Sequence, residues 1–574
     1  MSSKNVLLRG KVFAFSLFLL CVPAQAEMTF PNLFGDNMVL QQKAKNTIWG
    51  WTEAGRRVTI SSSWGAEASV IAGKDGKWSL LLETPVHGIG HSLEISDGVD
   101  KKLVKNVAIG EVWLCAGQSN MGWSLGQTFG GEQESAKADF PNYRIFKSSR
   151  EHWHEPLNKS RDRLAKWLPC TPKSAAATSA VSYYFGRKLH QELGVPVGII
   201  VQAYAGTPIE GWMPWQIQKD DARAQAHKKS LDDTVARQTT KLGMTHAKSL
   251  VDFNQELKTY NEKIDVGETM KNKFRQLSPP TITKPADLGN QYPAHIFNAM
   301  IYPVRPYGIR GMIWYQGERN AKNVPQALRY LQQLPQMIDY YRQSWFELSG
   351  GNTDENFPFY FTQLPSWNPA QKEPVEGEEA SWAVSREMMR LVSEEHANTG
   401  MVVTIDTGDP VLLHPQNKQP VGIRHAYLAL KRTYGKDLID SGPRYQKYSA
   451  KGNRVTLEFD STGGGLTAAR EGKLDALAIA GADRQWHWAD AEIKGNTVVL
   501  SAAAVAKPVA ARYAWAMNPS QRNLLYNKEG LPASPFRTDD WPLFEPGKEV
   551  IEVFKPKKPK GYQAADWQRP EMTQ

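Results

Sequence analysis

The first part of the chain is dominated by short segments in which apolar and polar residues alternate. Between residues 27 and 109 such segments follow one another, separated by turn-forming residues. A period of two is typical of half-buried β-strands, and no helical period is present in this region. We therefore expect residues 27–109 to form a small N-terminal β-sandwich-like domain.

A different pattern follows between residues 110 and 434, where continuous apolar runs alternate with helical stretches. Runs that are apolar throughout favour strands buried on both faces of a parallel sheet. Their alternation with helices predicts an α/β fold, in the form of a three-layer α/β/α domain. The runs are Glu111–Ala116, Val197–Tyr204, Gly311–Gln316, Phe359–Leu364 and Met401–Asp406.

Three further segments complete the expected organisation. Residues 216–279 interrupt the α/β pattern as a helical insertion, in which apolar residues recur every three or four positions and predict a helix that packs on a partner helix. Residues 435–545 return to short strands, either as a C-terminal β domain or as strands that complete the N-terminal one. Residues 546–574 form a basic, proline-containing tail.

The first 26 residues have the organisation of a secretory signal peptide. Lys4, Arg9 and Lys11 precede a short apolar run, and the sequence Ala-Gln-Ala ends at Ala26. This arrangement predicts cleavage after Ala26 and a secreted or periplasmic protein. No later segment approaches the roughly 18 consecutive apolar residues of a membrane-spanning helix, so no membrane span is expected.

Charge and cysteine content limit the possible partners. The formal net charge is +10, and its densest cluster, residues 555–560, is interleaved with proline and predicts a solvated tail rather than a nucleic-acid site. Cys115 lies in an apolar strand, so we expect a buried free thiol there rather than a disulfide with Cys170. No spacing of Cys and His residues indicates a zinc site. The oligomeric state is not indicated by the sequence.

Polar clusters follow three of the predicted strands: Gly117–Asn120, Ala205–Trp212 and Gln316–Asn320. In an open α/β sheet, sites form in the crevice at the carboxyl ends of the strands, so the three clusters are expected to converge. A helix-capping role would explain Ser119 but not the other two clusters, whereas a nucleophilic role explains all three. His414, on a loop after the fifth strand, is the candidate base for Ser119.

Five sequence blocks carry a resemblance that extends over nearly the whole chain: GDNMVLQQ, GEVWLCAGQSNM, GTPIEGWMP, WYQGERNA and HPQNKQPVG. In these blocks the chain resembles the sialate O-acetylesterase family of the SGNH-hydrolase superfamily. The resemblance implies an SGNH-hydrolase domain between the two β regions. It also implies an enzyme that removes O-acetyl groups from carbohydrates, with an acetylated carbohydrate as partner and no metal or organic cofactor.

The resemblance also implies roles for individual residues. Ser119 corresponds to the family's nucleophile and His414 to its catalytic histidine. The backbone N–H of Gly206 and the side-chain amide of Gln316 correspond to donors of the oxyanion hole, which stabilises the negative charge of a tetrahedral intermediate. The polar clusters themselves also suggest substrate-binding residues, namely Asn120, Trp212, Glu318 and Arg319. The ring of Trp212 is expected either to stack on a sugar ring or to pack in the core.

Two departures from the family pattern leave alternatives open. Relatives often carry an aspartate just before the histidine, whereas residues 411–413 are apolar here. Asp409 and Asp406 lie on the same loop as His414, and Glu318 or Glu210 could approach from neighbouring strand ends. We expect His414 to act in a Ser-His dyad, or with Asp409 as a displaced third member. Arg319 stands where relatives often have serine, and it would suit the carboxylate of a sialate. If Arg319 points into packing, a neutral plant polysaccharide such as acetylated xylan or xyloglucan becomes the expected substrate.

Two other classes of protein are alternatives to a carbohydrate esterase. A non-catalytic carbohydrate-binding protein with a degenerate site would explain the missing acid before His414. A lipase or peptidase is disfavoured, because no GxSxG turn surrounds Ser119 and no long apolar loop suggests a lid.

Overall fold

The computed structural model describes residues 27–265, 280 and 287–562. The predicted signal peptide, residues 1–26, lies outside these residues, as do parts of the predicted insertion and tail. Within the described part of the chain, no helix is both long enough and apolar enough to cross a bilayer. Cys115 and Cys170 are both buried and both free, which confirms the expectation of unpaired thiols.

One strand, β7 (Lys101–Gly117), joins the N-terminal strands to the central sheet. Its first half pairs with β6 and β1, and its second half pairs with β10 and β11. The boundary predicted between residues 109 and 110 therefore falls inside a continuous strand. The N-terminal strands are β1 (Val39–Gln41), β2 (Ala44–Trp51), β3 (Arg57–Ser62), β4 (Glu67–Ile71), β5 (Lys77–Thr84) and β6 (Gly88–Ser96).

The central sheet has the order β13-β12-β11-β7-β10-β8-β9, and all its neighbouring pairs are parallel except the edge pair β8–β9. The five predicted apolar runs supply β7 and four of the other strands, which confirms the expected α/β class with a parallel sheet. These strands are β8 (Phe140–Lys147), β9 (Trp167–Cys170), β10 (Val197–Ala203), β11 (Gly311–Tyr315), β12 (Phe359–Thr362) and β13 (Thr399–Val402).

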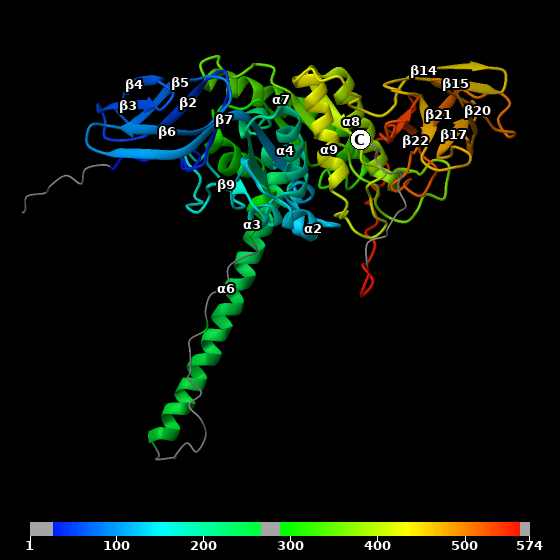
Figure 1. The fold of residues 1–574 in the computed structure, drawn as a ribbon. Helices are drawn as coiled ribbons and strands as arrows, with labels where there is room; N and C mark the ends of the chain where they lie inside the picture. Colours follow the sequence, from blue (N-terminus) through cyan, green and yellow to red (C-terminus); the bar gives the residue numbers. More distant parts are fainter. Residues whose placement is uncertain (1–26, 266–279, 281–286, 563–574) are drawn as a thin grey trace, which may run out of the picture.

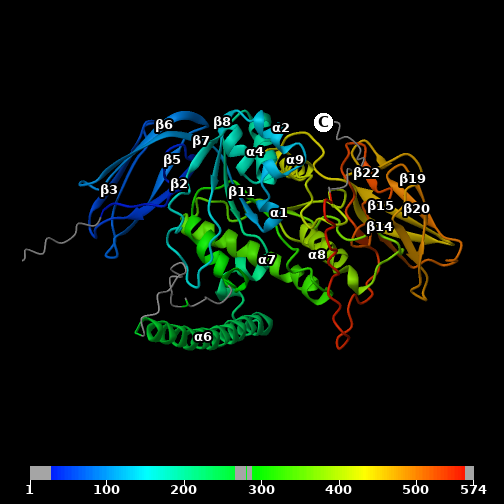
Figure 2. The ribbon, with the colours of Figure 1, turned by 90° about the horizontal axis from the view of Figure 1, so that it is seen from below.

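Helices cover both faces of this sheet, as Figure 2 shows. Val112, Leu114 and Ala116 of β7 belong to one core, together with residues of α7 and α8. The intervening Trp113 and Cys115 belong to a second core with residues of α4 and α9. Because successive side chains of a strand point to opposite faces, β7 contributes to both cores. The covering helices are α4 (Ala180–Leu193), α7 (Val324–Leu348), α8 (Ser381–Glu395) and α9 (Gln419–Leu428).

The predicted helical insertion contains α6 (Ala222–Asp265), which projects away from the body of the molecule (Figure 1). The expectation that its apolar stripe packs on a partner helix is wrong for the described residues, because Leu250 and Leu257 are exposed. Ion pairs between Lys and Asp four residues apart support the helix, as at Lys228 and Asp232.

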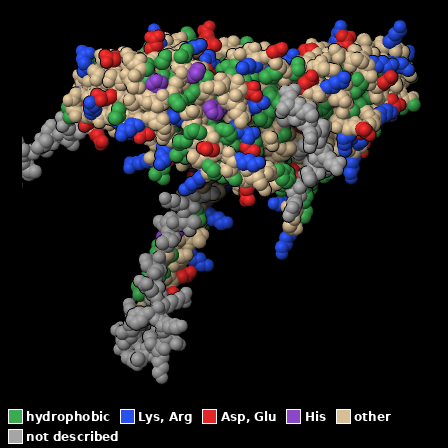
Figure 3. All heavy atoms as spheres, in the orientation of Figure 1, with side chains coloured by type: hydrophobic (Ala, Val, Ile, Leu, Met, Phe, Trp, Pro, Cys, Tyr) green, Lys and Arg blue, Asp and Glu red, His purple; other side chains and the backbone are tan. Residues whose placement is uncertain are grey.

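Over the face drawn in Figure 3, positive and negative side chains are interspersed.

The C-terminal strands pair with one another and not with the N-terminal strands, so they form a second β region. One sheet has the order β14-β15-β20-β19, a second has the order β18-β17-β21-β23, and β16 pairs with β22. Their bounds are β14 (Arg444–Lys451), β15 (Arg454–Asp460), β16 (Leu466–Ala468), β17 (Leu477–Ala480), β18 (Trp486–Trp488), β19 (Asp490–Lys494), β20 (Thr497–Ser501), β21 (Ala510–Tyr513), β22 (Leu525–Asn527) and β23 (Phe536–Arg537).

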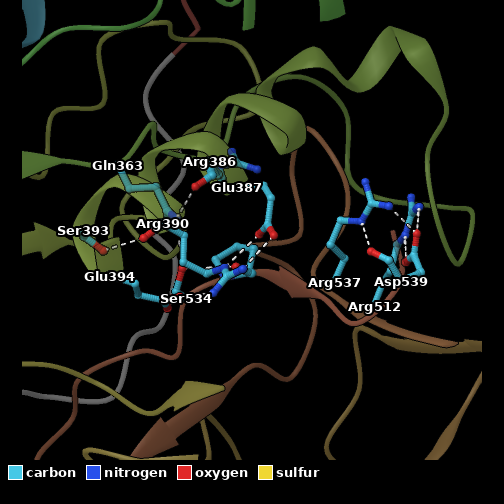
Figure 4. Close-up of polar contacts among 11 residues, drawn as sticks. Gln363, Arg386, Glu387, Arg390, Ser393, Glu394, Arg512, Ser534, Arg537 and Asp539 are labelled. Atoms are coloured by element: carbon cyan, nitrogen blue, oxygen red, sulfur yellow. Dashed lines mark hydrogen bonds and ion pairs between the residues drawn. The ribbon is translucent and has the colours of Figure 1, made fainter. Parts of the chain in front are cut away.

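Buried arginines connect this C-terminal region to the central domain and to itself (Figure 4). Arg386 of α8 is fully buried, and burial lowers the pKa of its guanidinium to about 9. Close by, Arg512 and Arg537 both pair with Asp539. The guanidinium of Arg386 donates to four backbone carbonyl oxygens at 2.7–2.9 Å, those of Leu364, Pro365, Ala516 and Met517.

Replacing Arg386 with methionine should strongly destabilise the junction between α8 and the C-terminal strands. The change removes the donors to four buried carbonyl groups, and we expect a loss of about 3 kcal/mol in the free energy of unfolding. Urea unfolding should show a lower midpoint. The exposed Arg163, changed to methionine, is the matched control and should leave the midpoint unchanged.

Candidate active site

The carboxyl ends of β7, β10 and β11 lie at one level of the sheet. Gly117, the last residue of β7, is in register with Ala203 of β10 and with Tyr315 of β11. Gly117 has φ +146°, and a Cβ built on it would lie 2.1 Å from the carbonyl oxygen of Tyr315, so only glycine fits. The three polar clusters that follow these strands therefore begin side by side, as the sequence predicts.

Ser119 and His414 are in direct contact at this edge. Ser119 begins the short helix α1 (Ser119–Gly122), one residue after Gln118, whose N–H is held by the Tyr315 carbonyl. Nε2 of His414 lies 2.8 Å from Oγ of Ser119. Both residues are half-buried and thus reachable by a ligand. This is the geometry that a histidine base needs to take a proton from a serine hydroxyl.

The imidazole of His414 is held in its neutral form. Burial, and secondly the nearby charge of Lys418, lower the pKa of His414 to about 4. The indole of Trp123 stacks on the imidazole, with ring centres 4.7 Å apart and an angle of 18° between the planes. A neutral imidazole can accept the serine proton, and the stacked indole restricts the ring orientation.

In the part of the chain that the structure describes, no carboxylate contacts the ring of His414. Among the residues that the structure describes, the ring has the Ser119 hydroxyl as its one hydrogen-bond partner and pairs with no acidic side chain. Asp409, the predicted third member, accepts hydrogen bonds from the N–H groups of Val411 and Leu412 at 2.8 and 2.7 Å and thereby shapes the turn before His414. These contacts fit the first of the two expected arrangements, a Ser-His dyad.

The other acids considered for this role also have different partners. Asp406 forms a two-point ion pair with Arg424 of α9. Glu210 accepts from the side-chain amides of Asn320 and Gln333. These contacts link helices and loops around the site rather than reaching the imidazole.

Two backbone donors are available near the serine. Gly206 has φ +72°, is exposed, and has open space where a Cβ would be. Within the described residues, the N–H groups of Ser119 and Gly206 make no hydrogen bonds. Both amide hydrogens of Gln316 are donated elsewhere, to the Thr207 carbonyl at 3.1 Å and to Oδ1 of Asn320 at 2.8 Å. Donation by Gln316 to an oxyanion would therefore require one of these bonds to break.

The four expected substrate-binding residues occupy different environments. Asn120 and Glu318 are buried and bind one another. Trp212 is fully buried, with its indole N–H donating to Thr207 and its ring packed edge-on against Trp314. A role for Trp212 in stacking on a sugar is therefore wrong, because its ring belongs to the core beneath α7.

Arg319, in contrast, lines an open pocket of about 520 Å³. Nε of Arg319 donates to Oε1 of Gln291, whose own amide donates to the carbonyl of Gly206, both at 2.9 Å. The terminal amino groups of Arg319 make no hydrogen bond within the described residues. Pro208 and Val550 form part of the wall, so the pocket lies between the loop of Gly206 and the C-terminal tail.

Comparison with known proteins shows which family the chain resembles. A family model described as carbohydrate esterase, sialic acid-specific acetylesterase, matches residues 109–276. Sialate O-acetylesterases of Rattus norvegicus and Homo sapiens are 27% and 26% identical, over 88% of this chain and 93% and 92% of theirs. The crystal structure of a carbohydrate acetylesterase from Xanthomonas citri matches with a TM-score of 0.72 and 31% identity, over 90% of this chain and 100% of that chain. The chain belongs to the sialate O-acetylesterase family of carbohydrate esterases.

Family membership confirms the assignment that the sequence motifs indicated. It supports carbohydrate O-acetylesterase function and implies an acetylated carbohydrate as the substrate. The described residues contain no group of three or more His, Cys, Asp and Glu side chains placed to hold a metal ion.

Sequence reasoning assigned no role to Lys418, which is buried and donates to Asn120. The available signal was a lysine four residues after His414, directly before the segment that forms α9. A cation at that position has to be solvated by the protein itself.

Changing Asp409 to asparagine should leave the catalytic rate constant nearly unchanged. The asparagine oxygen can still accept from Val411 and Leu412, and a dyad does not use the carboxylate charge. Steady-state hydrolysis of an acetyl ester gives the comparison. A fall approaching about 10⁴-fold, which is typical when a triad acid is neutralised, would instead identify Asp409 as the third member.

Proposed function

We propose that the protein hydrolyses carbohydrate O-acetyl esters through an acetyl-enzyme on Ser119. Nε2 of His414 takes the hydroxyl proton as Oγ of Ser119 attacks the acetyl carbonyl. The tetrahedral intermediate collapses, the sugar oxygen leaves, and His414 gives it the proton. A water molecule, deprotonated by the same imidazole, then attacks the acetyl-serine, releases acetate and restores the hydroxyl.

The observation that carries this proposal is the 2.8 Å contact between His414 and Ser119 at the shared strand edge. The free N–H groups of Ser119 and Gly206 would stabilise the oxyanion, and each such donor is commonly worth about 3 kcal/mol. Without a carboxylate partner the imidazolium gains no ionic stabilisation, so the alignment of the ring depends on its loop and on the stacked Trp123.

For the substrate, we propose an acetylated acidic sugar of the sialate type. Arg319 lines the pocket beside the Gly206 loop, and its terminal amino groups are donors from which a sugar carboxylate could accept two parallel hydrogen bonds. The family model and the relatives named as sialate O-acetylesterases support the same class. The signal-peptide pattern of the first 26 residues supports export to the periplasm or the medium. The enzyme would encounter its acetylated sugars there.

Changing Ser119 to alanine should abolish acetate release from acetylated sialic acid, with a loss of at least about 10⁴-fold. Wild type should also be labelled covalently at Ser119 by a serine-reactive phosphonate, as peptide mass spectrometry would show. Sugar binding without labelling and without acetate release would favour the alternative of a degenerate binding protein.

The pH dependence of kcat/KM should report the low pKa of His414. The imidazole works as a base only when neutral, and its pKa in the free enzyme is about 4, so kcat/KM should fall as the pH drops through about 4. Activity should thus be nearly constant between pH 6 and 7. A half-maximal point near the ordinary histidine value of about 6.5 would contradict the buried, neutral imidazole.

Changing Arg319 to glutamine should raise KM for acetylated sialic acid about 10- to 100-fold, because a charged hydrogen-bonded pair with the carboxylate is lost. The rate constant should change little, since the carboxylate is remote from the reacting carbonyl. Acetylated xylan, which lacks this charge, is the control substrate. Equal effects on both substrates, or faster turnover of xylan by wild type, would favour a neutral polysaccharide.

A further inference from the structure

Three loops of the site meet in one buried hydrogen-bonded network. Nζ of Lys418 donates to Oδ1 of Asn120, and Nδ2 of Asn120 donates to Oε1 of Glu318. The same Asn120 amide also donates to the carbonyl of Leu413 at 3.3 Å. Lys418, Asn120 and Glu318 have exposed fractions of 1%, 0% and 8%, so water contributes little to their solvation.

The network places one amide between a buried cation and a buried carboxyl group. The amide oxygen faces the lysine and the amide nitrogen faces the glutamate, so the charges of the two neighbours fix the orientation of Asn120. Burial lowers the pKa of Lys418 to about 7, and burial raises the pKa of Glu318. Loss of either charged group would leave the other without its counterpart in a dry environment, which is strongly unfavourable.

The backbone attachments of this network lie next to both reacting residues. Asn120 directly follows Ser119, and Leu413 directly precedes His414. The amide of Asn120 therefore ties the serine loop to the histidine loop at the point where a relative displacement would open the 2.8 Å contact. No carboxylate of the described residues does this from the ring side of His414.

Among the described residues, Lys418 is the one charged group that shifts the pKa of His414, and it comes second to burial. Ser119 and Trp123 face the ring from α1 and its following residue, and Lys418 lies on the same loop as the ring. Lys418 itself is faced by Glu318, through Asn120, and by the ring of Tyr315, 5.4 Å from Nζ. A fixed positive charge disfavours protonation of a nearby imidazole.

We propose that Lys418 is a positioning residue for the acyl transfer: through Asn120 it holds the Ser119 and His414 loops together, and its positive charge lies close to the imidazole of His414. This inference rests on the proposed serine mechanism. Lys418 touches neither the substrate nor the reacting atoms and acts through Asn120 and His414. The buried network thus performs, from the backbone side, the alignment that an acid on the ring performs in a triad.

Changing Lys418 to methionine tests both parts of the role. The acid limb of kcat/KM, near pH 4 in wild type, should move up by about one unit, because the cation that opposes protonation is gone. At its pH optimum, kcat should fall about 10- to 100-fold through misalignment, with little change in KM. Lys436 is exposed and serves as the control, so Lys436→Met should show neither effect.

A double variant keeps the test decisive if Lys418→Met folds poorly. Changing both Lys418 and Glu318 to glutamine removes the buried charges as a pair and leaves neutral side chains able to hydrogen bond to Asn120. The acid limb should still move upward, since the ammonium is absent. A folded variant of either kind with an unchanged limb and unchanged kcat would overturn the role of Lys418.

Failure of this inference is distinguishable from failure of the serine mechanism. Phosphonate labelling of Ser119 in wild type, followed as a function of pH, reports the base without any sugar. Absence of labelling and of acetate release in wild type would reject the mechanism itself. Normal labelling in wild type, with an identical pH profile in Lys418→Met, would reject the positioning role alone.

Discussion

The level at which three parallel strands end is the constraint on which the site depends. β7 pairs with β10 on one side and β11 on the other, and its last residue has no room for a side chain beneath the Tyr315 carbonyl. Because β7 also runs without a break into the N-terminal strands, the position of Ser119 is coupled to the packing of the whole sheet. The chain turns at Gly117, and the serine, the Gly206 loop and the Gln316 cluster begin next to one another.

His414 comes from outside this set of strand ends, and its loop is anchored separately. Ser366, after β12, donates to the carbonyl of Ile405 and accepts from the N–H of Asp409 through its own carbonyl. Asp409 then closes the turn before His414. The acid that sequence reasoning offered as a third catalytic member is thus used to shape the backbone. A tightly held loop and a stacked indole can position an imidazole where no carboxylate does so.

Much of this arrangement was predictable, and the exceptions have physical reasons. Continuous apolar runs are a strong signal, so the strands and the placement of Ser119 and His414 followed from pattern and motif. Trp212 was misassigned because a tryptophan next to polar residues has the same sequence signature whether its ring faces a ligand or the core. The partners of Gln316, Asp409 and Lys418 depend on contacts between residues far apart in the chain, which no local pattern encodes.

Buried cations recur in this protein where separate segments have to be held in one arrangement. Arg386 joins α8 to the C-terminal strands through four carbonyl groups, and Lys418 joins two catalytic loops through one amide. An apolar residue in either place could pack as well, and it would avoid the cost of desolvating a charge. It would not, however, fix the position of one segment relative to the other, since dispersion contacts have little directionality. A hydrogen-bonded cation does, and this directional demand accounts for a buried lysine bound to the residue that follows Ser119.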